Sequence, residues 1–120
     1  VLIVDDDPEV RDLIQITLEE RLGCGTILSP DGKDAITRFN EAKPKVIILD
    51  MMLPKKSGFL VMESLKPDRN AERPPYVVMI TGNEGPRHEK YALHLGVNEY
   101  LLKPVRMERL AALVKQYLEK

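Results

Sequence analysis

Short runs of apolar residues alternate with longer stretches of helical periodicity along this chain. The apolar runs cover residues 1–4, 25–28, 46–49, 76–80 and 99–102. The first, third and fourth are almost uninterrupted, which is typical of strands buried on both faces of a sheet. Because a helical stretch follows each run, the pattern predicts five βα units and a mostly parallel sheet.

The stretches between the strands predict five helices. Asp7 and Ser57 cap the first and third helices, and Gly23 and Gly96 end the first and fourth. The apolar faces predicted to be buried comprise Val10, Leu13, Ile14, Thr17 and Leu18, then Ala35, Ile36 and Phe39, then Phe59, Met62 and Leu65, then Tyr91, Ala92 and Leu95, and finally Met107, Leu110, Ala111, Val114 and Leu118. Right-handed crossovers place such helices on both faces of the sheet. The sequence therefore predicts a three-layer αβα sandwich.

Composition narrows the class of protein. A chain of 120 residues with 18 Lys plus Arg against 19 Asp plus Glu is expected to form one domain over residues 1–120. Its net charge of -1 predicts no direct contact with nucleic acid. The single cysteine, Cys24, cannot form an internal disulfide, and no apolar run approaches the roughly 20 residues that span a bilayer. We therefore expect a cytoplasmic protein without membrane contact.

Chemically distinctive residues follow four of the five predicted strands. In chain order they are Asp5, Asp6 and Asp7, then Asp50, then Thr81, and finally Lys103 with Pro104. The carboxyl ends of parallel strands share one edge of a sheet, where open α/β folds bind their ligands. We therefore expect these groups to converge.

Carboxylates held close together repel one another unless a cation lies among them. Ligands that offer only oxygen suit a hard ion such as Mg²⁺ or Mn²⁺. With Lys103 and the Thr81 hydroxyl, such an ion would form a receptor for a tetrahedral, doubly charged oxyanion. The sequence therefore predicts a phosphoryl-binding site. For Asp7 alone, the helix cap is the favoured role.

Four segments carry a family resemblance over essentially the whole chain. VLIVDDDPEVR, VIILDMMLPKKSG, VVMITGNE and NEYLLKPV resemble the CheY-like receiver domain of two-component response regulators. The resemblance implies a doubly wound, flavodoxin-like fold with five parallel strands in the order 2-1-3-4-5 and five helices.

The resemblance also implies a role for each acidic residue. Asp50 matches the residue that accepts a phosphoryl group from a phosphohistidine. Asp5, Asp6 and Asp50 match the carboxylates that hold Mg²⁺, and the backbone carbonyl of Met52 completes the protein ligands. The side chains of Met52 and Asn83 occupy positions that tune water access to the phosphoryl group, and we expect the apolar Met52 to slow hydrolysis.

The remaining strand-end residues match the switch of the family. Thr81 matches the hydroxyl that moves to the phosphoryl group, and Tyr100 matches the aromatic residue that then turns inward. Lys103 matches the ammonium that pairs with the phosphoacceptor, and Pro104 matches the cis-proline that shapes the loop.

The function implied is a signalling switch, which catalyses only its own phosphorylation and slow autodephosphorylation. Its expected partners are a histidine kinase or phosphotransfer protein, and an output domain or target that contacts the fourth helix, fifth strand and fifth helix; homodimerisation stays open. One alternative is a phosphorylation-independent pseudo-receiver. Another is a phosphohydrolase of the haloacid dehalogenase type, which residues 5–9 disfavour because they lack the Thr or Val of its DxDx(T/V) signature.

Two other features allow two interpretations each. Leu113 and Tyr117 form a second apolar strip on the last helix, which indicates either a wide core contact or a partner surface. Lys55 and Lys56 belong either to a solvated loop or to a patch that attracts an anionic donor.

Overall fold

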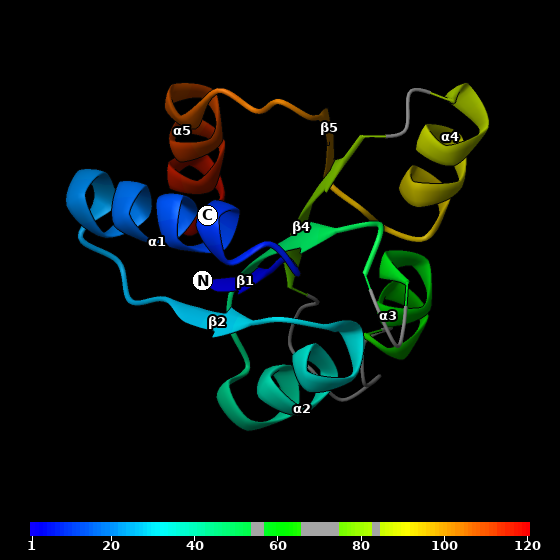
Figure 1. Cartoon of the computed structure of the whole chain (residues 1–120), viewed down its shortest axis with the longest axis horizontal. Helices are drawn as coiled ribbons and strands as arrows, with labels where there is room; N and C mark the ends of the chain where they lie inside the picture. The colour runs from blue at the N-terminus through cyan, green and yellow to red at the C-terminus, as the bar shows by residue number, and fades with distance from the viewer. Residues whose placement is uncertain (54–56, 66–74, 83–84) are drawn as a thin grey trace.

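The computed structural model describes residues 1–53, 57–65, 75–82 and 85–120. The strands within these residues are β1 (Leu2–Val4), β2 (Ile27–Ser29), β3 (Val46–Asp50), β4 (Tyr76–Thr81) and β5 (Glu99–Leu102). The helices are α1 (Pro8–Leu22), α2 (Gly32–Ala42), α3 (Gly58–Ser64), α4 (Pro86–His94) and α5 (Met107–Leu118). Strands and helices alternate along the chain, as predicted (Figure 1).

The helix ends predicted at Asp7, Ser57 and Gly23 are confirmed, and Gly96, with φ of 104°, follows Leu95, the C-cap of α4. The Asp7 carboxylate accepts a hydrogen bond from the Glu9 amide, and the Ser57 hydroxyl accepts one from the Leu60 amide. Gly23 ends α1 in the left-handed conformation, with φ of 63°. These caps satisfy amides that the first helical turn leaves without a partner, and a glycine tolerates the positive φ at the other end.

The second strand lies further along the chain than predicted. It begins at Ile27 instead of residue 25 and ends at Ser29. Its register with β1 explains the shift, because Ser29 pairs with Val4 and its carbonyl accepts a hydrogen bond from the Asp5 amide at 3.2 Å. Ladder pairing therefore outweighs the apolar pattern at this edge of the sheet.

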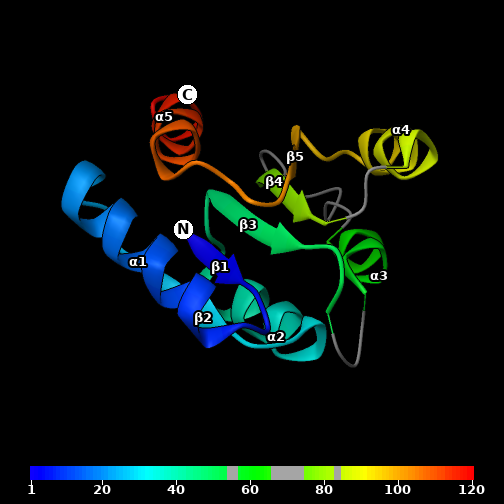
Figure 2. The same ribbon diagram turned by 45° about the horizontal axis from the view of Figure 1, so that its top comes forward.

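The described strands form one parallel sheet in the order β2-β1-β3-β4-β5, which confirms the predicted topology. The helices cover both faces (Figure 2). Side chains from α2, α3 and α4 pack on one face, and those from α1 and α5 pack on the other. Among the described helices, none is long and apolar enough to cross a membrane.

Two predicted core residues are exposed instead. Leu13 is 51% exposed because the buried line of α1 runs through Ile14, Thr17 and Leu18, to one side of it. Tyr91 is 43% exposed, packs edge-on against Phe59 and donates a hydrogen bond to Glu63, so it contacts α3. A helical period of 3.6 residues leaves the margins of an apolar face uncertain in sequence.

The second apolar strip of α5 is a core contact. Tyr117 is buried, its ring lies 4.9 Å from that of Tyr76, and its hydroxyl donates to Glu99 Oε1 at 2.8 Å. Leu113 is half-buried and packs against the same core cluster. The partner-surface interpretation of this strip is therefore wrong for Tyr117.

A candidate acidic site at the carboxyl edge of the sheet

The register of the central strands places two buried carboxylates side by side. Val4 pairs with Leu49 between β1 and β3, so Asp5, just after β1, lies beside Asp50, the last residue of β3. Their residues are only 2% and 3% exposed. Burial of two adjacent carboxylates is unfavourable unless a cation compensates their charge.

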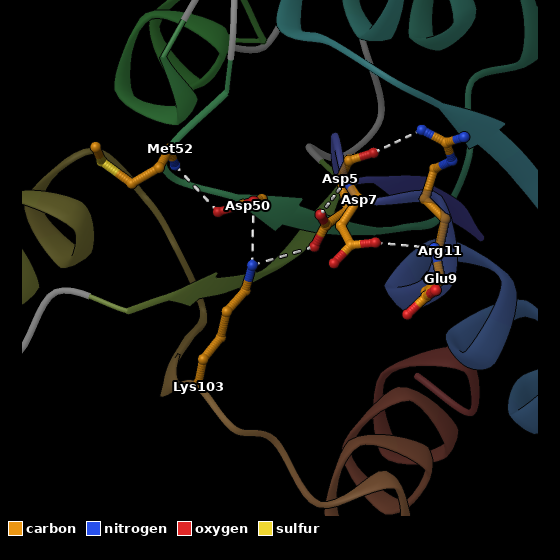
Figure 3. Close-up of polar contacts among 7 residues, drawn as sticks. All are labelled: Asp5, Asp7, Glu9, Arg11, Asp50, Met52 and Lys103. Carbon is orange, nitrogen blue, oxygen red and sulfur yellow. Dashed lines mark hydrogen bonds and ion pairs between the residues drawn. The ribbon is translucent and has the colours of Figure 1, made fainter.

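Lys103 supplies one such cation. Its Nζ lies 3.2 Å from Asp50 Oδ2 and 3.4 Å from Asp5 Oδ2, as Figure 3 shows. The Lys103 amide donates to the Thr81 carbonyl at 2.8 Å, which ties the end of β5 to the end of β4. The peptide bond between Lys103 and Pro104 is cis. Lys103, which follows β5, thus reaches both Asp5 at the end of β1 and Asp50 at the end of β3.

Neighbouring charges influence the protonation of Asp50 and Lys103. Burial raises the pKa of Asp50 above its ordinary value, and the charge of Asp5 adds to the rise, although the Met52 amide and Lys103 oppose it. Burial alone would lower the pKa of Lys103, but the charges of Asp50 and Asp5 outweigh that effect and raise it. Lys103 is therefore held in its charged form.

Asp6 completes a trio of carboxylates. One oxygen each from Asp5, Asp6 and Asp50 lies within 4.8 Å of the others, and Asp6 faces solvent while the other two are buried. This donor set contains oxygen only, and one member is open to water. Those properties fit Mg²⁺, which binds through one or two carboxylates and retains several waters.

Two hydrogen bonds to Asp5 hold the loop between β1 and α1. The Asp7 amide donates to Asp5 Oδ1 at 2.9 Å, and Arg11 Nη1 donates to the Asp5 carbonyl at 2.9 Å (Figure 3). Asp7 itself caps α1, as predicted, so its carboxylate is turned to the helix. Arg11 was not predicted as part of the site, because nothing in the sequence indicates that its side chain folds back to residue 5.

The segment after Asp50 turns sharply into α3. The Met52 amide donates to Asp50 Oδ1 at 3.0 Å, while the Met52 residue is 66% exposed. The Gly58 amide donates to the Met51 carbonyl at 2.8 Å. A Cβ on Gly58 would lie 2.7 Å from Met51 Cα and 2.9 Å from the Asp50 carbonyl oxygen. A glycine is therefore required here for close approach of two backbone segments.

Thr81 and Tyr100 lie on neighbouring strands beside the acidic trio. Thr81 is fully buried, and its side chain is hydrogen-bonded to that of Tyr100. Tyr100 is half-buried and packs against the core cluster that α2, α3 and α4 cover. Burial and the charge of Glu89 raise the pKa of the Tyr100 phenol, although the hydrogen bond with Thr81 opposes the rise. The two expected switch residues are thus in direct contact.

Three further residues considered from the sequence, Lys55, Lys56 and Asn83, lie outside the described residues. All the residues expected at the strand ends are described. The structure brings Asp5, Asp6, Asp50 and Lys103 together at one edge of the sheet.

This fold and this site define a class of α/β domains with a flavodoxin-like strand order and an acidic cluster beside a lysine. The chain belongs to one family within that class, the response regulator receiver domain, whose family model matches residues 1–115. The resemblance seen in the four sequence segments is therefore confirmed. Response regulator receiver domains belong to two-component signalling systems.

The chain is also similar to individual proteins. The chain is 32% identical to an uncharacterized 14.6 kDa protein of Leptolyngbya boryana, over 98% of this chain and 88% of that protein. It is 31% identical to the DNA-binding response regulator MtrA of Mycolicibacterium smegmatis, of which it spans only 50% while all of this chain is covered. The receiver domain of Francisella response regulator 1452 has the same fold, with a TM-score of 0.88, 26% identity and coverage of 98% of this chain and 94% of that one.

Proposed function

We propose that residues 1–120 form one receiver domain in which Asp50 accepts a phosphoryl group from the phosphohistidine of a histidine kinase or phosphotransfer protein. The observation that carries this proposal is the environment of Asp50. Its carboxylate is buried at the ligand-binding edge of the sheet, pairs with Lys103 at 3.2 Å and belongs to the acidic trio. Membership of the receiver family supports the same role.

In this reaction a carboxylate oxygen of Asp50 forms a bond to phosphorus while the bond from phosphorus to the donor imidazole breaks. Negative charge is spread over the three equatorial phosphoryl oxygens during the transfer. Lys103 and the Thr81 hydroxyl would stabilise that charge, and the position of both residues at the same edge as Asp50 supports this role. The product is an acyl phosphate, which water can hydrolyse in the same pocket.

Asp5, Asp6 and Asp50, with the backbone carbonyl of Met52, would hold Mg²⁺ or Mn²⁺ at this site. When bound, the ion neutralises part of the phosphoryl charge and brings the anionic donor close to a cluster of carboxylates. The oxygen-only donor set and the exposed Asp6 support this assignment. Lys103 pairs with Asp5 and Asp50, so a bound ion would compete with its ammonium for these two carboxylates.

We further propose that phosphorylation switches the face formed by α4, β5 and α5. The Thr81 hydroxyl would exchange its partner Tyr100 for a phosphoryl oxygen, and Tyr100 would follow inward. Contact between the two side chains supports this coupling. The face would then signal to an output domain or target protein, and the similarity to a DNA-binding response regulator supports an output of that kind.

The test is the intact mass of the protein after incubation with acetyl phosphate and Mg²⁺. We expect the mass to rise by one phosphoryl group and to return slowly to its starting value. Asp50→Asn and chelated samples should gain nothing, while Asp34→Asn, on helix α2 and outside the acidic trio, should behave like wild type. No gain under conditions that phosphorylate a receiver of known activity would contradict the proposal and favour a phosphorylation-independent binding module.

A further inference from the structure

Arg11 makes a contact that the proposed chemistry does not use. It lies in the first turns of α1, and its Nη1 donates to the Asp5 carbonyl at 2.9 Å. Figure 3 shows the guanidinium on the side of Asp5 away from Lys103. The contact therefore leaves the carboxylate oxygens of Asp5 available to other partners.

The contact acts on the peptide unit that joins Asp5 to Asp6. A carbonyl oxygen lies in the plane of its peptide bond, so a hydrogen bond to that oxygen restrains the orientation of the whole peptide plane. The backbone of the next residue, Asp6, is restrained with it. Asp5 is also held elsewhere, because its amide donates to Ser29 and its carboxylate accepts from Asp7 and Lys103. Asp6 has no comparable support: among the described residues, no hydrogen bond reaches its carboxylate.

Another nitrogen of the Arg11 guanidinium is buried in an unfavourable environment. Within the described part of the chain, Arg11 Nε is buried and has no hydrogen-bond partner. A buried donor without an acceptor is unfavourable. A charged donor to a carbonyl forms a stronger hydrogen bond than a neutral one, and this strength suits a residue that must fix a loop.

We propose that Arg11 is a positioning residue for the divalent cation. By restraining the peptide between Asp5 and Asp6, it holds the exposed Asp6 carboxylate within reach of Asp5 and Asp50. The inference rests on the proposed Mg²⁺ site and adds a residue outside the ligand set to it. Groups that orient metal ligands typically change metal affinity by about 10-fold to 100-fold when removed.

The experiment compares Mg²⁺ binding by wild type, Arg11→Met and Arg11→Lys, measured by calorimetry on unphosphorylated protein. Methionine keeps much of the apolar stem but removes every donor, whereas lysine keeps one charged donor. We expect the Kd for Mg²⁺ to rise about 10-fold or more in Arg11→Met and less in Arg11→Lys. Labelling of Asp50 by acetyl phosphate should need more Mg²⁺ but should approach the wild-type rate at saturation. Arg38→Met, which removes an exposed arginine of α2, is the matched control.

If Arg11 only stabilises the fold, the result is different. Arg11→Met would then lower the urea midpoint measured without metal and leave the Kd for Mg²⁺ within twofold of wild type, which would overturn the proposal. If Arg11→Met does not fold, Arg11→Gln, which has a shorter side chain and no charged donor, decides in its place, and an unchanged Kd in that variant also overturns the proposal. Failure of the wild-type protein to bind Mg²⁺ at all would instead remove the proposed metal site, and the role of Arg11 with it.

Discussion

The Lys103 ammonium lies 3.2 Å from Asp50 Oδ2, although 53 positions separate the two residues in sequence. The same ammonium lies 3.4 Å from Asp5 Oδ2. Lys103 therefore pairs with both buried members of the acidic trio, and its single positive charge offsets only part of their negative charge. A divalent cation that binds there must share these carboxylates with it.

Lys103→Met should consequently change metal binding and phosphoryl transfer in opposite directions. Without the ammonium, Mg²⁺ no longer competes with Lys103 for Asp5 and Asp50, so we expect the Kd for Mg²⁺ to fall several-fold. Phosphorylation by acetyl phosphate at saturating Mg²⁺ should slow by roughly 100-fold, as it does when one group that stabilises transition-state charge is lost.

Calorimetry and the time course of intact mass measure the two effects on the same preparation. Lys33→Met, on the exposed side of α2, serves as the control for loss of a lysine. A parallel loss of Mg²⁺ affinity and transfer rate would contradict the expected competition, and would indicate that Lys103 mainly maintains the fold of the site.

Met52 offers a test of how long the phosphoryl group survives. Its residue is 66% exposed directly beside Asp50, and its amide holds Asp50 Oδ1. We expect Met52→Asn to shorten the half-life of the acyl phosphate, because an amide side chain can orient water where the apolar thioether cannot. Met52→Leu should keep the wild-type half-life. The decay of the phosphorylated mass after removal of the donor gives both values, and an unchanged half-life in Met52→Asn would show that water access is set elsewhere.

Tyr117 should make the stability of the protein depend on pH. It lies at the start of β4 and β5, at the end of the sheet opposite the acidic trio. Burial raises the pKa of its phenol above the ordinary 10.0, and the hydrogen bond to Glu99 and the charge of that carboxylate add to the rise. The native state therefore keeps this proton at pH values where the unfolded chain has lost it. Stability from this group is complete below pH 10 and falls as the pH rises from there through the native pKa.

Tyr117→Phe removes that contribution. At pH 7 we expect the free energy of unfolding to fall by about 1 to 2 kcal/mol, from loss of a hydrogen bond to a charged group. The difference between wild type and variant should then shrink as the pH is raised past 10. Urea unfolding followed by circular dichroism between pH 8 and pH 11 measures it. Two curves that stay parallel over this range would show that Tyr117 does not titrate differently in the native state.

The strand ends were predictable because a parallel sheet gathers the residues that follow its strands. Asp5 and Asp50 needed only the apolar runs before them and the predicted direction of the chain, and the register of β1 with β3 confirms their proximity. Lys103 followed from the same reasoning on β5. The candidate site was thus predictable from apolar runs that are each followed by a polar residue, because a parallel sheet brings the ends of these runs to one edge.

Arg11 and Gly58 were not predictable in this way. The contact of Arg11 with the Asp5 carbonyl depends on a long side chain turning back over its own helix. The need for a glycine at position 58 depends on how closely the backbone of α3 approaches that of Met51. Neither relation has a period or a spacing in sequence, because each is set by three-dimensional packing. The error at Leu13 has a related cause, since an apolar side chain at the margin of a face can point to solvent.

Gly58→Ala tests that packing and its link to the phosphoacceptor. The added Cβ would meet Met51 Cα at 2.7 Å and the Asp50 carbonyl oxygen at 2.9 Å, and both are backbone atoms that cannot rotate away. We expect a loss of about 1 to 3 kcal/mol in the free energy of unfolding, as is typical of overpacked sites. Because the strain falls on the backbone of Asp50, phosphorylation should also slow in the fraction that remains folded.

Gly25→Ala is the matched control, because a Cβ there meets nothing within 4 Å. Urea unfolding should show little change in that variant, and acetyl phosphate should label it at the wild-type rate. Equal stability of Gly58→Ala and Gly25→Ala would mean that α3 moves aside at little cost. Unequal stability with equal labelling rates would mean that the start of α3 adjusts without moving Asp50, so that the backbone contact supports the fold and not the phosphoacceptor.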